Sequence, residues 1–262
     1  MTEKDTTYSS IWLFRKNRNL CNGTKDPIAN MKNFRQVRGK YFSEFNPTIA
    51  ENIINFWSNE DDLILDPFAG RTRCFISSKN NRRYIGFEIS KQVTDKINIL
   101  IKQPKLEEVK YQPCLYNMDS FNMDTLKLPQ VDLIFTCPPY WNLETYESCD
   151  GQLSDIKDYN NFLLRYKEIM KKSIELLKED KYMCLVVGDF RKNKKYYTFH
   201  IDNIKIMEEL GLKLHDIILI QSVTFDIANK RFGMFKKHKF TSKVHEYLLV
   251  FKKCSFNING VK

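Results

Sequence analysis

Two consecutive prolines, Pro138 and Pro139, constrain the fold of this chain more than any other feature of its sequence. The residues before them, Val131–Phe135, are apolar with a single charge, which predicts a short buried strand. Proline fixes φ and has no N–H to donate, so a central strand cannot continue through this pair. We therefore expect the chain to leave the sheet at Pro138 in a rigid turn. In open α/β sheets, ligands bind at the edge where such a turn would lie.

Two aromatic residues, Tyr140 and Trp141, follow the prolines directly. The turn should direct both rings toward whatever binds beyond the end of the strand. A proline-rich loop with one packed aromatic ring is the alternative, and the motif alone leaves it open.

The composition is that of an ordinary globular protein, with 262 residues and 42% hydrophobic side chains. Seven cysteines without a Cys-x-x-Cys pair indicate a reducing compartment, and they predict neither a disulfide framework nor a zinc site. His238 and His245 are not at metal spacing, so we assign no metal ligand. The polar start and the lack of a long apolar run predict a cytoplasmic protein without a membrane partner.

The net charge of +10 is distributed unevenly along the chain. Residues 1–40 carry +6, residues 41–180 carry −5 and residues 181–262 carry +9. This distribution suggests that basic ends grip a polyanion around a less basic centre. A solvated lysine-rich surface explains the charge about equally well.

A nucleotide-binding βαβ unit is predicted in the first half of the chain. A strand over Asp62–Asp66 is followed by the small-residue turn Pro67–Gly70, and a second strand ends at Glu88. Asp66 and Glu88 lie 22 positions apart, close to the interval at which such units place an acid on the ribose. Two carboxylates that cap helices are the structural alternative.

The other elements predict one α/β domain over residues 34–253, after an N-terminal arm (residues 1–33) and before a tail (residues 254–262). The expected helices cover residues 49–57, 71–79, 91–101, 160–178 and 201–210, and the further strands cover residues 110–116, 182–187, 214–223 and 244–251. A basic segment at about residues 224–243 interleaves lysines with phenylalanines, as nucleic-acid contact surfaces do.

Several motifs resemble those of the DNA amino-methyltransferases. Asp66–Gly70 resembles the S-adenosylmethionine motif of that family, and Thr136–Tyr140 resembles its catalytic motif. Tyr41–Pro47 is similar to an additional cofactor motif, and Glu246–Lys252 is similar to the last strand of the N4-cytosine/N6-adenine methylase domain. The order, with the cofactor motif first, is that of the group with a C-terminal recognition region. The resemblance covers about residues 34–253.

The resemblance implies a Rossmann-like, mostly parallel sheet with a terminal antiparallel strand, and S-adenosyl-L-methionine as cofactor. Glu88 would accept the ribose hydroxyls, and Asp119 would meet the adenine amino group. The full set of implied cofactor-binding residues is Asn46, Pro47, Asp66, Phe68, Gly70, Glu88, Asp119 and Thr136.

The implied catalytic residues are Cys137, Pro138, Pro139 and Tyr140. Hydrogen-bond acceptors at positions 137 and 138 would favour the pyramidal, nucleophilic form of an exocyclic amine. Tyr140 would stack on a base extruded from the duplex. The expected substrate contacts are Trp141, Lys236, Lys237 and Lys239.

Cys137 departs from the family, which usually has Asp, Asn or Ser there. Since a thiol is a weak acceptor, the carbonyl of Pro138 should matter more. Cysteine is closest in size to serine, which favours N4 of cytosine as the methylated atom. N6 of adenine, an RNA substrate and a non-catalytic nucleic-acid-binding protein remain as alternatives. The expected partner is double-stranded DNA, with a cognate restriction endonuclease as a further one.

Overall fold

The computed structural model describes residues 9–13, 45–102, 109–143, 148–221, 232–241 and 243–255. Most of the expected arm, the start of the Tyr41–Pro47 motif, part of the basic segment and most of the tail lie outside these residues. The strands are β1 (Ile11–Leu13), β2 (Leu63–Asp66), β3 (Arg83–Phe87), β4 (Cys114–Tyr116), β5 (Val131–Thr136), β6 (Leu177–Val187), β7 (Phe190–Lys192), β8 (Lys195–Tyr197), β9 (Leu212–Gln221) and β10 (Glu246–Lys253). The helices are α2 (Pro47–Trp57), α3 (Arg73–Lys79), α4 (Lys91–Ile101), α6 (Tyr159–Leu176), α7 (Phe199–Glu209) and α9 (Phe232–His238), with 3-10 turns η3 (Ser120–Thr125) and η4 (Leu153–Asp155).

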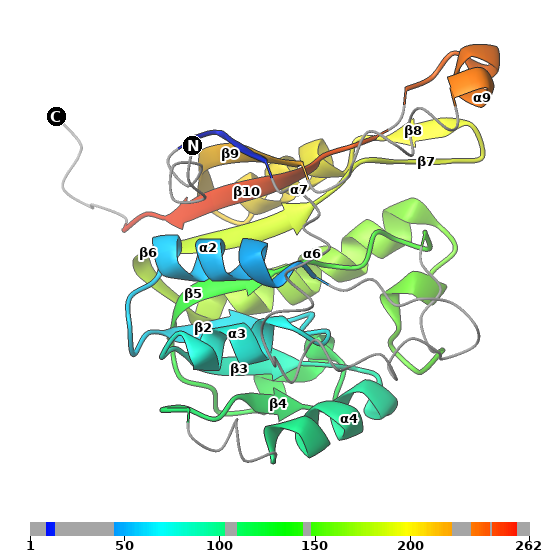
Figure 1. Cartoon of the computed structure of the whole chain (residues 1–262). Helices are drawn as coiled ribbons and strands as arrows, with labels where there is room; N and C mark the ends of the chain where they lie inside the picture. Colours follow the sequence, from blue (N-terminus) through cyan, green and yellow to red (C-terminus); the bar gives the residue numbers. More distant parts are fainter. Residues whose placement is uncertain are drawn as a thin grey trace, which may run out of the picture.

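Eight of the described strands form one sheet in the order β1-β9-β10-β6-β5-β2-β3-β4 (Figure 1). The last strand, β10, runs antiparallel to both of its neighbours, β6 and β9. The other pairings in this sheet are parallel. The expected α/β, Rossmann-like class with an antiparallel last strand is confirmed.

The sheet is buried on both faces, as continuous apolar strands require. Every residue of β2 and β5 is buried. Helices α2, α3 and α4 cover one face, and α6, α7 and η3 cover the other (Figure 1). The two hydrophobic layers leave the carboxyl edge of the parallel strands as the place where polar side chains converge.

Side-chain caps explain where α2, α4 and α6 begin. The Asn46 side chain accepts a hydrogen bond from Thr48 N at 2.9 Å, and Pro47 occupies the first turn of α2. Ser90 caps α4, whose bounds match the predicted residues 91–101, and Asp158 caps α6. The helix expected over residues 71–79 begins two residues later, at Arg73.

The structure adds elements that the sequence analysis did not predict. Residues 11–13, expected to belong to an N-terminal arm, form β1 and pair in parallel with β9. A short hairpin, β7–β8, follows the end of β6. The described part of the basic segment contains the helix α9, and the strand expected over residues 110–116 is confined to Cys114–Tyr116.

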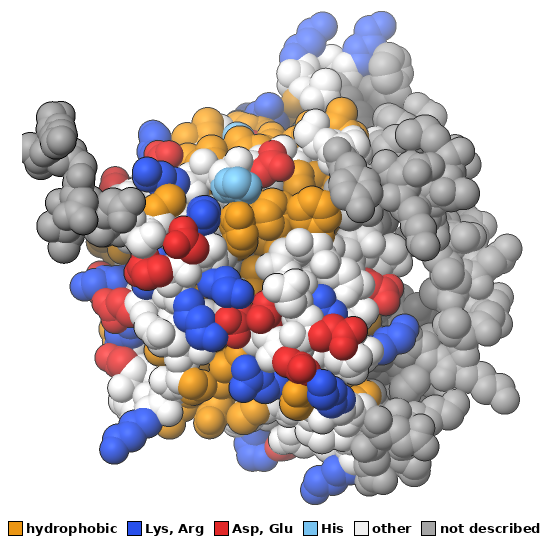
Figure 2. Space-filling view, turned by 90° about the vertical axis from the view of Figure 1, so that its left-hand side faces the viewer, with side chains coloured by type: hydrophobic (Ala, Val, Ile, Leu, Met, Phe, Trp, Pro, Cys, Tyr) orange, Lys and Arg blue, Asp and Glu red, His pale blue; other side chains and the backbone are white. Residues whose placement is uncertain are grey.

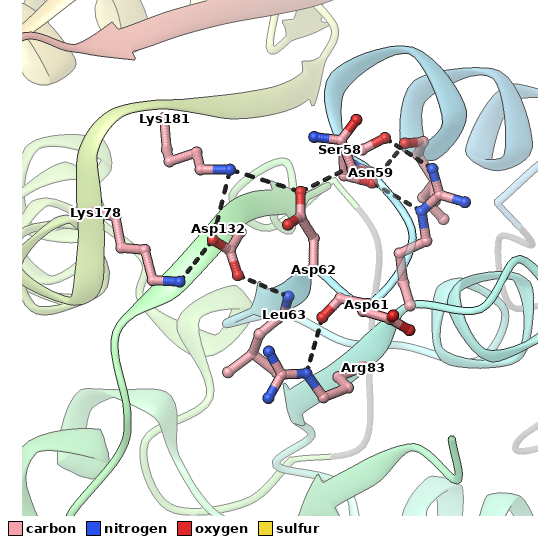
Figure 3. A network of polar contacts seen from close by, with 11 residues as sticks. Ser58, Asn59, Asp61, Asp62, Leu63, Arg83, Asp132, Lys178 and Lys181 are labelled. Atoms are coloured by element: carbon pink, nitrogen blue, oxygen red, sulfur yellow. Dashed lines mark hydrogen bonds and ion pairs between the residues drawn. The ribbon is translucent and has the colours of Figure 1, made fainter. Parts of the chain in front are cut away.

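A network of ion pairs ties together the opposite edge of the sheet, where the parallel strands begin (Figure 3). Asp132 accepts a hydrogen bond from Leu63 N at 3.0 Å and pairs with Lys178 at 2.7 Å. Lys181 bridges Asp132 and Asp62 at 3.5 and 3.7 Å. Burial acts to raise the pKa of Asp132, but the Leu63 N–H and the lysines outweigh it, so the pKa is lowered. This edge is therefore stabilised by a carboxylate that stays ionised.

The face shown in Figure 2 carries acidic and basic side chains that are interspersed around an apolar area. Interspersed charges of both signs produce little net field, unlike a continuous basic surface. The described part of this face therefore shows no continuous basic surface.

Candidate active site

The carboxyl edge of the sheet brings together most of the residues that the sequence analysis selected. Asp66 ends β2, Glu88 follows β3, and Thr136 ends β5, and these three parallel strands are neighbours. Glu246 begins β10 at the same edge, because this strand runs antiparallel. The expected cofactor motif and the Pro-Pro-Tyr motif are therefore adjacent in space.

A hydrogen bond joins these two motifs directly. Thr136 Oγ1 donates to Asp66 Oδ1 at 2.6 Å, and both side chains are fully buried. Pro138 is buried just beyond this contact, and Cys137 and Pro139 are half-buried. The start of the Pro-Pro turn is thus fixed to the end of the neighbouring strand.

The Asp66 carboxylate is occupied by groups of the protein itself. Arg73 Nε lies 2.6 Å from Oδ2, and the Tyr84 hydroxyl donates to the same oxygen at 2.9 Å. Phe68 N donates to Oδ1 at 3.1 Å. Asp66 and its four protein donors form a brace that holds the turn after β2 in place. Asp66 therefore supports the expected cofactor site by fixing the backbone of this turn.

Arg73 was not selected from the sequence, yet it lies at the centre of this brace. Its Nη2 donates to the Phe68 carbonyl at 2.5 Å, and its guanidinium lies 5.1 Å from the Phe45 ring centroid. Burial acts to lower the pKa of Arg73, but the Asp66 carboxylate outweighs it and raises the pKa, so the ion pair stays charged. The only sequence signal for this role of Arg73 was its position, one helical turn after Gly70.

The turn after β2 offers an open surface at Gly70. Gly70 has a φ of +56°, and the nearest atom to a Cβ built on it is 4.0 Å away. The Glu88 carboxylate accepts hydrogen bonds from Ser90 N at 2.8 Å and from the Gly70 backbone. Burial raises the pKa of Glu88 to about 7. An acid placed against an open glycine turn fits the ribose end of S-adenosylmethionine.

Asp119 begins η3 at the end of β4 and has protein partners of its own. It accepts hydrogen bonds from Phe121 N at 2.9 Å and from Arg165 at 2.6 Å. Arg165, which the sequence analysis missed, lies 4.1 Å from the Phe121 ring centroid. A side chain on Gly151 would overlap Asp119, so the chain packs closely here.

Asn46 and Pro47 lie at the start of α2, near the brace. The preceding ring, Phe45, packs edge-on against Phe135 of β5 at 5.6 Å. The segment expected to close the cofactor pocket is thereby attached to the end of β5.

Tyr140 is held by three groups. Its hydroxyl donates to Glu246 Oε1 at 2.7 Å and lies 3.8 Å from Cys137 Sγ, and its ring packs edge-on against Phe199 at 6.0 Å. Burial, followed by Cys137 and Glu246, raises the pKa of Tyr140 well above its usual value. Tyr140 therefore stays protonated and donates. Glu246 was missed as a site residue because nothing local in the sequence connects it to Tyr140.

Trp141 does not reach the edge as expected. A φ of 52° turns the chain, and the residue is only 6% exposed. Its indole Nε1 donates to the Ile156 carbonyl at 2.8 Å, and its ring packs against Tyr159 and Tyr197 at 5.3 Å. Trp141 is a core residue of the segment after the Pro-Pro turn in this structure.

Lys236, Lys237 and Lys239 are exposed on and just after α9. This helix projects from the body of the molecule beside the β7–β8 hairpin (Figure 1). The structure therefore places the three lysines on a projection and not in the Tyr140 pocket.

Comparison with known families gives an extensive match. The model of a family described as DNA methylase matches residues 1–99 and 131–260, which is most of the chain. A stretch of 59 residues, 22% of this chain, is 46% identical to the orphan methyltransferase M.BamHII of Bacillus amyloliquefaciens. A stretch of 105 residues, 40% of the chain, is 31% identical to the type II methyltransferase M.MjaVI of Methanocaldococcus jannaschii. These stretches span 22% and 52% of the two relatives.

Solved structures of other proteins share the fold. NSun6 from Pyrococcus horikoshii superposes with a TM-score of 0.54 at 16% identity, over 82% of this chain and 53% of that one. TrmN from Thermus thermophilus gives 0.52 at 12% identity, over 80% of this chain and 49% of that one. At these identities the likeness concerns the architecture alone.

Proposed function

We propose, on the premise that this chain belongs to the DNA methylase family, that it methylates an exocyclic amino group of a base in DNA, with N4 of cytosine favoured. S-adenosylmethionine is the cofactor and supplies a methyl group bound to a sulfonium. We assign the activity to a domain over residues 34–253, with the described part of the basic segment as its DNA-contacting projection.

The observation that carries this proposal is the Thr136–Asp66 hydrogen bond of 2.6 Å. It fixes the Pro-Pro-Tyr turn beside the turn that contains Gly70, so the amine-binding groups and the methyl donor would occupy adjacent positions. Such fixed proximity replaces a bimolecular encounter by an oriented one, which is a large part of catalysis in methyl transfer.

The chain's own groups account for the remaining requirements. An exocyclic amine is a poor nucleophile because its lone pair is delocalised into the ring. In our proposal, acceptors at Cys137 and Pro138 bind its N–H groups and favour the pyramidal form. Tyr140 stacks on the extruded base. Its hydrogen bond to Glu246 and its edge-on contact with Phe199 fix the ring beforehand, which lowers the entropic cost of stacking.

The preference for cytosine rests on the size of the side chain at position 137. A half-buried thiol occupies the space that a serine hydroxyl would fill. The second candidate is methylation of adenine at N6, which uses the same acceptors and the same stacking ring.

Nucleoside mass spectrometry tests the proposal directly. Genomic DNA from a methylation-deficient host that expresses the protein is digested and compared with DNA from an empty-vector host and from a host that expresses Tyr140→Ala. We expect N4-methylcytosine only with the wild-type protein. N6-methyladenine would overturn the base assignment and retain the mechanism. Neither product, from a folded protein that binds S-adenosylmethionine by calorimetry, would refute the proposal.

A further inference from the structure

Lys243, just before β10, places its charged end near the ring of Tyr140. Its Nζ lies 5.6 Å from the centroid of the Tyr140 ring. The same nitrogen fills the space beside Gly188, at the end of β6, where any side chain would overlap it. The residue as a whole is exposed, but its ammonium points inward between β6 and the Pro-Pro turn.

The ammonium contacts the Tyr140 ring but forms no ion pair with the carboxylates near it. Burial of the ammonium lowers the pKa of Lys243, while Glu246, Asp189 and Cys137 act in the opposite direction. Both carboxylates are engaged elsewhere, since Glu246 accepts from Tyr140 and Asp189 accepts from His200 Nδ1 at 2.7 Å. Among the residues that the structure describes, Lys243 Nζ makes no hydrogen bond or ion pair. Its three N–H groups are therefore available to an acceptor from outside the chain.

We propose that the Lys243 ammonium donates a hydrogen bond to an acceptor atom on the edge of the extruded target base. This inference rests on the proposed function, because it assumes that a base stacks on Tyr140. Both candidate bases carry such acceptors: N3 and O2 in cytosine, and N1, N3 and N7 in adenine. A position beside the stacking ring and against Gly188 suits the base edge better than the phosphate backbone, which tracks along the protein surface.

The test compares Lys243→Met with the wild-type protein on two duplexes. One duplex contains the site that the wild-type protein methylates, and the other has an abasic residue in place of the target base. Binding is measured with sinefungin, a cofactor analogue without a transferable methyl group. We expect Lys243→Met to bind the first duplex about tenfold more weakly, as for the loss of a charge-assisted hydrogen bond. We expect it to bind the abasic duplex as the wild-type protein does.

Two further variants complete the design. Lys213→Met is the control, because Lys213 is exposed and lies at the end of β9 that is far from Lys243. This variant should bind both duplexes as tightly as the wild-type protein does. Gly188→Ala keeps Lys243 but displaces its ammonium, so it should reproduce the selective loss; Gly188 does not have a positive φ that alanine would strain. If Lys243→Met does not fold, Gly188→Ala alone tests the inference.

Each contrary result is distinct. Equal loss on both duplexes would assign Lys243 to a phosphate and overturn the inference. A second contrary result is that binding is unchanged, kcat is reduced and the pH profile of kcat loses one limb. This result would make Lys243 a proton acceptor and would also overturn the inference. If the wild-type protein methylates no DNA, the proposed function has failed, and this is seen before any variant is compared.

Discussion

The Tyr140 hydroxyl donates a hydrogen bond of 2.7 Å to Glu246 Oε1 across 106 positions of the sequence. This bond connects the Pro-Pro turn after β5 to the first residue of β10, so the orientation of the ring depends on the strand that lies beyond β6. In the function that we propose, the tyrosine that stacks on the base is thereby fixed at its polar end, and its ring face is the contact surface.

Tyr140→Phe should keep the stacking face and lose this anchor. Because hydrogen bonds to charged groups contribute about 1.5–3 kcal/mol, we expect methylation to slow by about tenfold or more. Single-turnover rates at saturating DNA give the measurement. Calorimetry with S-adenosylmethionine should give an unchanged affinity, and a matching loss of cofactor binding would show that the hydroxyl maintains the fold of the whole edge.

Arg73→Met should strongly destabilise the protein, since it leaves the Asp66 carboxylate buried without its counterion. Removal of one partner of a buried ion pair costs about 3–5 kcal/mol. Denaturant unfolding measures the change in the free energy of unfolding. The control is Lys91→Met, which removes an exposed pair with Asp95 and should cost less than about 0.5 kcal/mol. An equal effect of the two changes would contradict the role of the brace.

Glu88→Gln should weaken the cofactor affinity about tenfold or more and stabilise the free protein at pH 8. The pKa of Glu88 is raised from 4.5 to about 7, so the folded state retains a proton that the unfolded state releases. The contribution of Glu88 to stability is therefore fully present below pH 4.5 and is lost as the pH rises through 7. Glutamine removes this loss, but it also removes the charged acceptor for the ribose hydroxyls.

Calorimetry at pH 6 and pH 8, together with thermal unfolding, measures both effects. The exposed change Glu175→Gln is the control and should alter neither. A Glu88→Gln variant with the affinity of the wild-type protein would remove Glu88 from the cofactor site.

Asp132→Asn should destabilise the protein at neutral pH and less so in acid. The pKa of Asp132 is lowered in the folded state, so its contribution is present above the unfolded pKa, about 3.9, and is lost as the pH falls through the folded value. The difference in the free energy of unfolding between wild type and variant should therefore shrink below about pH 4. Urea titrations at pH 7, 5 and 3.5 give this difference, and Asp95→Asn is the surface control. A difference that stays constant down to pH 3.5 would contradict the lowered pKa.

Simultaneous replacement of Lys236, Lys237 and Lys239 by alanine should reduce the salt dependence of DNA affinity. Each lysine that binds a phosphate adds about 0.9 to the slope of log K against log salt concentration, so the slope should fall by up to about 2.7. Fluorescence anisotropy between 50 and 200 mM salt gives the slope. A triple alanine variant of the exposed Lys171, Lys205 and Lys213 is the matched control. An unchanged slope would remove the projection from the DNA contact surface.

Patterns that are local in the sequence predicted the fold well. Buried strands bounded by turns, such as Val131–Phe135 before the prolines, identified the sheet, and the helix expected over residues 91–101 matches α4. The same patterns placed Asp66, Glu88 and Thr136 at one edge, because parallel strands end together.

Partners from distant parts of the chain could not be predicted. Arg165 and Glu246 reach Asp119 and Tyr140 only after the helices and strands have packed, and no sequence spacing encodes that approach. Trp141 differs from expectation because its positive φ, which few side chains adopt, turns its ring into the core. The edge strand β1 is only three residues long, too short for a periodic signal.

The place of β10 between β6 and β9 also has a consequence for the order of folding. Of the strands that the structure describes, β10 comes last in the chain, so it enters the sheet between two strands made before it, and it hydrogen-bonds to both β9 and β6. Glu246, the residue that anchors Tyr140, is the first residue of this strand. A growing chain therefore carries Tyr140 for more than a hundred residues before Glu246 can anchor its hydroxyl.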